Sequence, residues 1–155
     1  MTTTAPPVDS RVIGLAHYAA RAVLERVLAP HGIDFLQSVA LRLVVTADGP
    51  VERAGLAAEV MGAVKVTEAD ALRALEALTA AGLVSADGPS RVRATDAGRE
   101  VHAAASAATA PVAARIYAGI SDADRAVTGR VLALITERAD AELAVQDARN
   151  VESNI

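Results

Sequence analysis

Apolar residues recur every three or four positions in the first third of the chain, which is the spacing of one helix face. Between residues 12 and 28 they are Ile13, Ala16, Ala20, Leu24, Val27 and Leu28. A proline and a glycine follow within 30–32, and they end this predicted helix. Asp34 and Gln37 then have the spacing of a capping box, so we predict a second helix over 35–46.

The middle of the chain combines two short helices with a hairpin. We predict a third helix over 53–61 and, after a cap at Thr67, a fourth helix over 68–81. The buried stripe of the fourth helix is expected to be Ala71, Leu72, Leu75 and Leu78. β-Branched residues on both sides of a turn at 87–89 predict a two-stranded β-hairpin over 83–94. The pattern is helix, turn, helix and β-wing.

Two helices complete the pattern. Thr95 can cap a fifth helix, which Pro111 should kink or break because proline has no amide hydrogen and clashes with the preceding turn. Ser121 and Asp124 have capping spacing for a sixth helix. Its apolar stripe would be Val127, Val131, Leu134 and Ile135. The predicted fold class is therefore mainly α with a small β-hairpin.

Composition restricts the chemistry. The chain has no cysteine, which excludes disulfides and cysteine-ligated zinc, and its three histidines form no metal-site pattern with carboxylates. Phosphate-loop and nucleophile-elbow motifs are absent, so no metal and no cofactor are expected. A net charge of −4 is unusual for a nucleic-acid-binding protein. Without a signal-peptide pattern or a long apolar run, we expect a cytoplasmic protein with no membrane contact.

Several short motifs follow one another in a recognisable order. They are 30–33 with Gln37 and Leu41, Leu56-Ala57, Gly82-Leu83-Val84, Thr95 with Gly98, and Ile120-Ser121 with Asp124-Arg125. In this order they resemble the MarR family of winged helix-turn-helix transcription regulators. The resemblance implies a homodimer and a ligand pocket between the dimer platform and the winged helix. Apolar stripes on the terminal helices, which the chain is too short to cover, agree with a homodimer.

The resemblance also suggests a domain organisation. We expect a disordered leader over 1–9, a single MarR-like domain over 10–145 and a fraying tail over 146–155. Within the domain, the winged helix would span 51–95. The dimerisation helices would span 10–29 and 96–145.

The expected DNA-reading surface departs from the family in three ways. The helix-turn-helix is about one turn longer, with 62–65 as the surplus, and the wing is shorter. The reading helix begins with Glu68 and Asp70, which suit the positive end of a helix dipole better than they suit DNA. The remaining candidate DNA contacts are Lys65, Arg73, Arg91 and Arg93. DNA binding is therefore possible but doubtful, and a solvated helix face explains Arg73 equally well.

Two histidines and four other polar residues are candidates for small-molecule chemistry. His17 shares a face with Ile13 and Ala20, so it should point inward as an acid–base group or as a core or interface residue. His102 is the second candidate catalytic group. The candidate ligand contacts are Tyr18, Arg21, Arg42 and Tyr117.

Each of these candidates has an alternative. Arg42 interrupts an apolar run, so its guanidinium either anchors an acidic or carbonyl-bearing ligand or reaches solvent. Tyr18 and Arg21 lie on a polar helix face, where Arg21 could simply pair with Glu25. A kink at Pro111 could open space between His102 and Tyr117, although both also suit a dimer interface.

Two functions are compatible with these features. The first is a repurposed MarR-like scaffold for a hydrophobic small metabolite. It is either a binding protein or a cofactor-free acid–base enzyme such as a cyclase, dehydratase or isomerase. The alternative is a ligand-responsive MarR-family repressor. The alanine- and arginine-rich composition suggests a high-GC bacterium, where such proteins often accompany secondary metabolism. The altered reading surface favours the repurposed scaffold by a small margin.

Overall fold

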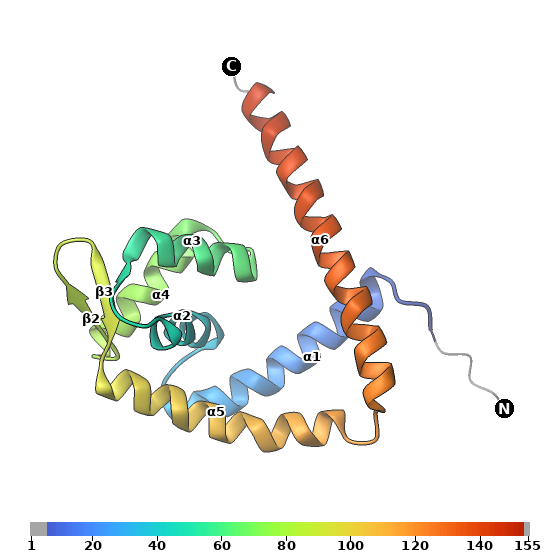
Figure 1. Ribbon diagram of the computed structural model, residues 1–155, viewed down its shortest axis with the longest axis horizontal. Coiled ribbons are helices and arrows are strands. Elements are labelled where there is room, and N and C mark those ends of the chain that lie inside the picture. The colour runs from blue at the N-terminus through green and yellow to red at the C-terminus, as the bar shows by residue number, and fades with distance from the viewer. Residues whose placement is uncertain (1–5, 154–155) are drawn as a thin grey trace. The chain divides into compact units, whose positions relative to one another are not determined.

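The computed structural model describes residues 6–153 and is mainly helical, with one small antiparallel sheet (Figure 1). In chain order its elements are α1 (Ser10–Leu28), η1 (Ala29–His31), α2 (Phe35–Thr46), β1 (Val51–Glu52), α3 (Arg53–Val64), α4 (Glu68–Ala80), β2 (Val84–Asp87), β3 (Arg91–Ala94), α5 (Asp96–Tyr117) and α6 (Asp122–Ser153). The chain divides into two compact units at residue 113. In the described part of the chain, no helix is long and apolar enough to cross a membrane.

Side-chain caps determine where the first two helices begin. Asp9 accepts a hydrogen bond from the Val12 amide at 2.8 Å, so α1 starts slightly earlier than predicted. The capping box at α2 is complete, because Asp34 accepts from the Gln37 amide at 2.8 Å and the Gln37 side chain accepts from the Asp34 amide at 3.1 Å. The predicted bounds of α2 are confirmed. Of the expected leader, residues 1–5 lie outside the described residues.

The winged helix contains α3, α4 and a three-stranded sheet in the order β1-β3-β2. The predicted hairpin pairs Val84 with Ala94 and Asp87 with Arg91. The two-residue strand β1 adds to its edge, and it is too short to be predicted from alternation. The apparent surplus at 62–65 extends α3, which ends where Lys65 adopts a left-handed backbone with φ 55°.

Aliphatic side chains from α2, α3, α4 and β2 form the core of the first unit. The largest fully buried residues are Leu41, Leu75, Leu78, Val44, Val60 and Val84. The helix α2 packs against α3, α4 and β3, and it also contacts α1. The helix α2 therefore links the winged helix to α1 through packed side chains.

The helix α5 begins directly after its cap Thr95 and continues through Pro111. The Thr95 hydroxyl accepts from the Gly98 amide at 3.0 Å and donates to the Gly82 carbonyl at 2.7 Å, which joins the start of α5 to the segment between α4 and β2. Pro111 lies inside the helix, so a break there is wrong, and a kink stays a prediction. Alanine-rich turns with high helix propensity flank the proline and compensate for its missing hydrogen bond.

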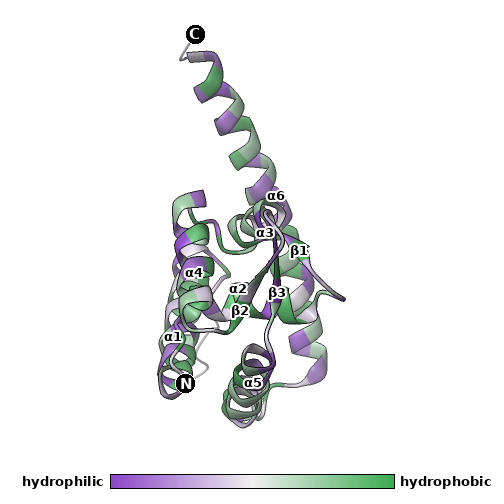
Figure 2. Ribbon diagram, turned by 90° about the vertical axis from the view of Figure 1, so that its left-hand side faces the viewer, coloured by the Kyte–Doolittle hydropathy of each residue, from purple (hydrophilic) through white to green (hydrophobic). Residues whose placement is uncertain are grey.

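The second unit consists mainly of α6, along which hydrophilic and hydrophobic residues alternate (Figure 2). The Ser121 hydroxyl accepts from the Asp124 amide at 3.1 Å, as its capping spacing predicted. The predicted apolar stripe is 38% to 49% exposed and comprises Val127, Val131, Leu134 and Ile135. The helix continues to Ser153, and fraying of its last turns stays a prediction.

Candidate functional site

A cavity of about 450 Å³ lies between α1, α2 and α5 in the first unit. This volume falls within the range of about 300–1,000 Å³ that is typical of small-molecule pockets. The lining residues come from all three helices and the segment before α2, and they are Leu24, Leu28, Ile33, Phe35, Ser38, Val39, Leu41, Arg42, His102, Ala105, Ser106, Thr109 and Ala110. Most of this surface is apolar, which suits a hydrophobic ligand.

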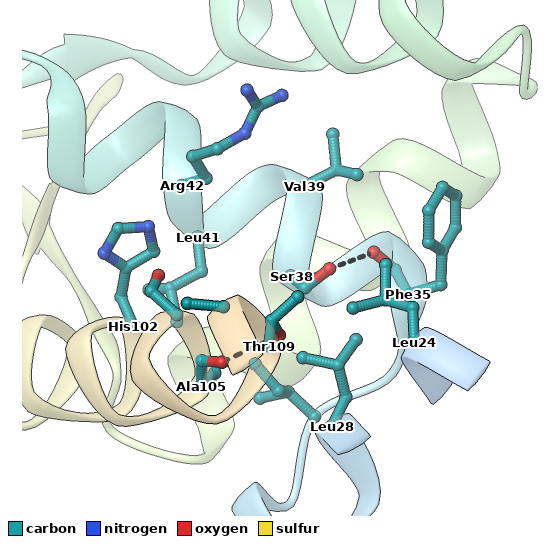
Figure 3. A pocket seen from close by; sticks show the side chains of 13 residues that line it. Leu24, Leu28, Phe35, Ser38, Val39, Leu41, Arg42, His102, Ala105 and Thr109 are labelled. Carbon is teal, nitrogen blue, oxygen red and sulfur yellow. Dashed lines mark hydrogen bonds between the residues drawn. The ribbon is translucent and has the colours of Figure 1, made fainter. Parts of the chain in front are cut away.

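The two side chains of the cavity that can carry a positive charge lie at one end. Figure 3 shows Arg42 of α2 and His102 of α5 at this end, with Leu24, Leu28 and Phe35 at the opposite end. A guanidinium presents several donors in a plane that matches a carboxylate, and an imidazole can donate or accept. The cavity can therefore hold a ligand with an apolar body and an acidic group.

Arg42 is the only charged side chain that lines this cavity among the described residues, apart from the titratable His102. No carboxylate within residues 6–153 lies at ion-pair distance from its guanidinium. Arg42 is exposed at the cavity rim, so water screens its charge. The cavity therefore offers a single cation at its rim to an acidic group.

Two hydroxyl groups lie between the polar and apolar ends. Ser38 donates its proton to the Phe35 carbonyl at 2.7 Å, and Thr109 donates to the Ala105 carbonyl at 2.8 Å (Figure 3). Each hydroxyl already donates its hydrogen bond to a backbone carbonyl, so its oxygen can only accept a hydrogen bond from a ligand. The two hydroxyl groups therefore suit a ligand that carries a hydrogen-bond donor.

Helical periodicity explains how this site is assembled. Lining residues of α2 lie three, four and seven positions after Phe35, and lining residues of α5 have the same spacing after His102: they are Phe35, Ser38, Val39 and Arg42, and His102, Ala105, Ser106 and Thr109. Residues at this spacing lie on one helix face. The sequence analysis selected Arg42 and His102 but missed Ser38 and Thr109, which this periodicity could have identified.

Two other predicted site residues on α1 lie outside the cavity. His17 is exposed within the chain and does not line the cavity, so the prediction that its imidazole points inward is wrong for the isolated chain. Tyr18 is also exposed, and its ring meets the His17 ring edge-on with centroids 5.4 Å apart. The uncovered N-terminal half of α1 explains both placements.

Arg21 and Tyr117 are likewise separate from the cavity. Arg21 forms an ion pair with Glu25 at 3.0 Å, and its guanidinium lies 4.6 Å from the centre of the Phe35 ring. Tyr117 belongs to the second unit, where Arg125 lies 5.0 Å from its ring centre. Of the two residues between which a kink at Pro111 was expected to open space, His102 lines this cavity and Tyr117 does not.

The candidate DNA contacts of the wing are paired with a carboxylate of the same hairpin. Arg91 lies 3.4 Å from Asp87, and Arg93 lies 3.8 Å from the same carboxylate. All three side chains are at least partly exposed, so these pairs contribute little to stability. They do lower the net positive charge that the wing offers to a polyanion.

The candidate DNA contact at the start of the reading helix α4 is likewise paired with a carboxylate of its own helix. Thr67 caps the helix by accepting from the Asp70 amide at 3.2 Å, and its hydroxyl donates to the Asp70 carboxylate at 2.6 Å. Arg73 also pairs with Asp70. The hydrogen bond from Thr67, followed by the one from Arg73, lowers the pKa of Asp70 below its ordinary value. Lys65, the remaining candidate, donates to the Gly62 carbonyl at 2.7 Å.

Comparison with known proteins shows what fold this is. No protein-family profile and no curated protein matches the sequence. CouR from Rhodococcus jostii RHA1, bound to p-coumaroyl-CoA, matches with a TM-score of 0.69 at 19% identity, over 81% of this chain and 88% of CouR. Two structures of the Mycobacterium tuberculosis MarR family protein Rv2887 match at 22% identity. The complex with salicylic acid has a TM-score of 0.61, over 84% of this chain and 98% of Rv2887. The complex with DNA has a TM-score of 0.64, over 83% of this chain and 98% of Rv2887. The chain has the winged-helix fold of MarR-family regulators, as the sequence predicted.

Proposed function

We propose that this protein is a ligand-responsive, DNA-binding transcription regulator whose effector is a small hydrophobic acid. The observation that carries the proposal is the position of α2, which lines the ligand cavity with Arg42 and packs against the reading helix α4. A ligand that displaces α2 side chains therefore acts on the element that would contact DNA. Allosteric control requires this kind of shared element between two sites.

The similar structures support both parts of the proposal. CouR is bound to an aromatic thioester that carries phosphates, and Rv2887 is bound in one structure to an aromatic acid and in another to DNA. An aromatic carboxylate would place its acidic group beside Arg42 and its ring toward Leu24 and Leu28. These neighbours favour the regulator over the repurposed scaffold, which the sequence analysis preferred.

A homodimer is part of the same proposal. The stripe on α6 leaves four large aliphatic side chains exposed, and Leu15 and Tyr18 of α1 are 63% and 70% exposed. Exposed apolar surface of this extent is typical of a subunit interface. A second copy of the chain is the partner that we propose for it.

A scaffold that binds ligand but not DNA is the second candidate. It is favoured by the ion pairs that Arg73, Arg91 and Arg93 make with Asp70 and Asp87. Conversion of the ligand without a cofactor is not supported, because His102 lines the cavity whereas His17 does not. The two predicted catalytic histidines therefore do not act together within this cavity.

Salicylate titration tests the ligand site. Arg42→Met should weaken salicylate binding by at least about tenfold, since a hydrogen bond to a charged group contributes roughly 1.5–3 kcal/mol. Arg26→Met is the matched control, because Arg26 is an exposed arginine of α1 outside the cavity lining. Equal binding by the wild type and Arg42→Met in isothermal titration calorimetry would refute the assignment of Arg42.

DNA binding separates the two candidate functions. A duplex from the region upstream of the protein's own coding sequence should bind in a salt-dependent manner, and salicylate should weaken that binding. Arg73→Ala should lower the affinity measured by fluorescence anisotropy. Salicylate binding without any salt-dependent DNA binding would instead support the scaffold that has lost its DNA-reading function.

A further inference from the structure

A smaller cavity of about 270 Å³ lies where the end of α2, the strand β3 and the first turns of α5 meet. Its walls are mostly small and uncharged, and they are Val44, Ala47, Gly49, Pro50 and Ala94. Its remaining lining residues are Arg93 and Arg99. Within the described part of the chain, this cavity thus has two cationic side chains and no acidic one.

The two arginines are only loosely paired with carboxylates. Arg93 lies 3.8 Å from Asp87, and Arg99 lies 3.7 Å from Asp96, so both separations exceed ordinary hydrogen-bond length. The four side chains are partly or fully exposed, and neither aspartate lines the cavity. A stronger acceptor inside the cavity can therefore replace these contacts at little cost.

Both guanidinium groups are attached to ordered backbone. Arg93 lies in β3, where its partner in the ladder is Ser85. Arg99 donates to the Ala94 carbonyl at 3.0 Å, which holds its side chain across the junction between β3 and α5. Two cations supplied by different elements thus line one cavity, and the hydrogen bond of Arg99 lowers the entropic cost of ordering that side chain around a ligand.

We propose that this cavity binds a phosphoryl group through Arg93 and Arg99. Two guanidinium groups can share the oxygens of one phosphate, and their planar donor sets match those oxygens. The volume accommodates a phosphate or a small phosphate ester but no drug-sized ligand. The group comes either from a free phosphate-bearing small molecule or from the DNA backbone, and only the DNA source rests on the function proposed above.

Inorganic phosphate is the probe for the first source. At constant ionic strength, with chloride as the replacement anion, phosphate should shift the amide NMR signals of Gly49 and Ala94 in a saturable manner. Arg93→Ala and Arg99→Ala should each weaken this binding by at least about tenfold. Arg91→Ala is the matched control, because Arg91 also lies in β3 and pairs with Asp87 but does not line the cavity.

The salt dependence of DNA binding tests the second source. Arg93→Ala and Arg99→Ala should each reduce the slope of log affinity against log salt by about one on any duplex, as expected for one lost phosphate contact. A reduced slope without phosphate saturation assigns the group to DNA. If the wild type binds no DNA, the proposal of a transcription regulator fails. The phosphate titration alone then tests the phosphoryl site.

Two results would overturn the phosphoryl site. The first is that phosphate causes no saturable shift of the amide signals and that either the variants leave the salt slope of DNA binding unchanged or the wild type binds no DNA. The other is an equal effect of Arg91→Ala and Arg93→Ala on the binding of inorganic phosphate, which would show that the general charge of the wing is responsible. Backbone amide spectra of each variant show whether it remains folded.

Discussion

The backbone of Gly98 in α5 lies directly against the carbonyl group of Leu83. A Cβ atom added to Gly98 would stand 2.0 Å from the Leu83 oxygen and 3.0 Å from its carbonyl carbon. The same oxygen accepts a hydrogen bond from the Thr95 amide at 3.1 Å. The first turn of α5 is therefore in backbone contact with the segment that joins α4 to the wing.

This contact predicts that Gly98→Ala destabilises the protein. Replacing glycine by alanine within a helix usually stabilises by about 0.5–1 kcal/mol. At Gly98 the added methyl group meets backbone, which cannot rotate away, so we expect the free energy of unfolding to fall by roughly 1–3 kcal/mol. Urea denaturation followed by circular dichroism measures this change.

Gly62→Ala is the matched control for this substitution. Gly62 lies in α3, and no atom comes within 4 Å of a Cβ added there. This variant should gain about 0.5–1 kcal/mol of stability. If the two variants are stabilised equally, the close approach of Gly98 to Leu83 does not exist in solution.

The helix starts were predictable because their determinants are local. The caps at Asp34, Thr67 and Ser121 act within three residues, so the spacing in the sequence is also the spacing of the hydrogen bond. At Pro111 the sequence rule failed, since the surrounding turns of α5 outweigh one missing donor. The strand β1 could not be predicted because two residues carry no periodic signal.

The candidate site was predictable only in part. Periodicity shows which residues share a helix face, whereas tertiary packing decides which face is covered. On α1, Leu24 and Leu28 line the cavity while His17, one turn or more earlier, stays exposed. Arg42 was identified because a charged residue stands out within an apolar run. Ser38 was missed because a small polar residue at such a position gives no comparable signal.

Asp87 is expected to limit the affinity of the wing for DNA. Its carboxylate faces both Arg91 and Arg93, so Asp87→Asn removes one negative charge from between two cations. Affinity for a nonspecific duplex should rise at low salt, and the salt slope should steepen by up to about one. Fluorescence anisotropy at several salt concentrations measures both quantities.

The control for Asp87 is a substitution with the same change in charge. Glu100→Gln on α5 alters the net charge by the same amount at an exposed position outside the wing. It should leave the salt slope close to that of the wild type. Equal slopes for Asp87→Asn and the wild type would show that the wing arginines do not contact DNA.

Thr67 is expected to control the ionisation of Asp70. Its hydroxyl is the largest cause of the lowered Asp70 pKa, and Arg73 is the next. We expect Thr67→Ala and Arg73→Gln each to raise this pKa toward its ordinary value. Carbon NMR of the Asp70 carboxylate, titrated with acid, gives both values, and an unchanged pKa in Thr67→Ala would contradict the assignment.

The same contact predicts a direction for the pH dependence of stability. Because the pKa of Asp70 is lower in the folded chain than in the unfolded chain, its ionised form stabilises the fold above the unfolded pKa. This contribution is lost as the pH falls through the folded pKa. The stability difference between the wild type and Asp70→Asn in urea should therefore shrink on acidification, and a constant difference would contradict it.

The exposed stripe of α6 predicts how the protein assembles. Leu134→Glu places a charge among side chains that a second copy would bury, and burying an unpaired charge is costly. We expect this variant to shift the protein from dimer to monomer in analytical ultracentrifugation. Because α6 is a single helix, Thr136→Glu introduces the same charge on a different face and should leave the dimer intact. A monomeric wild type, or equal dissociation of the two variants, would show that this stripe is not the subunit interface.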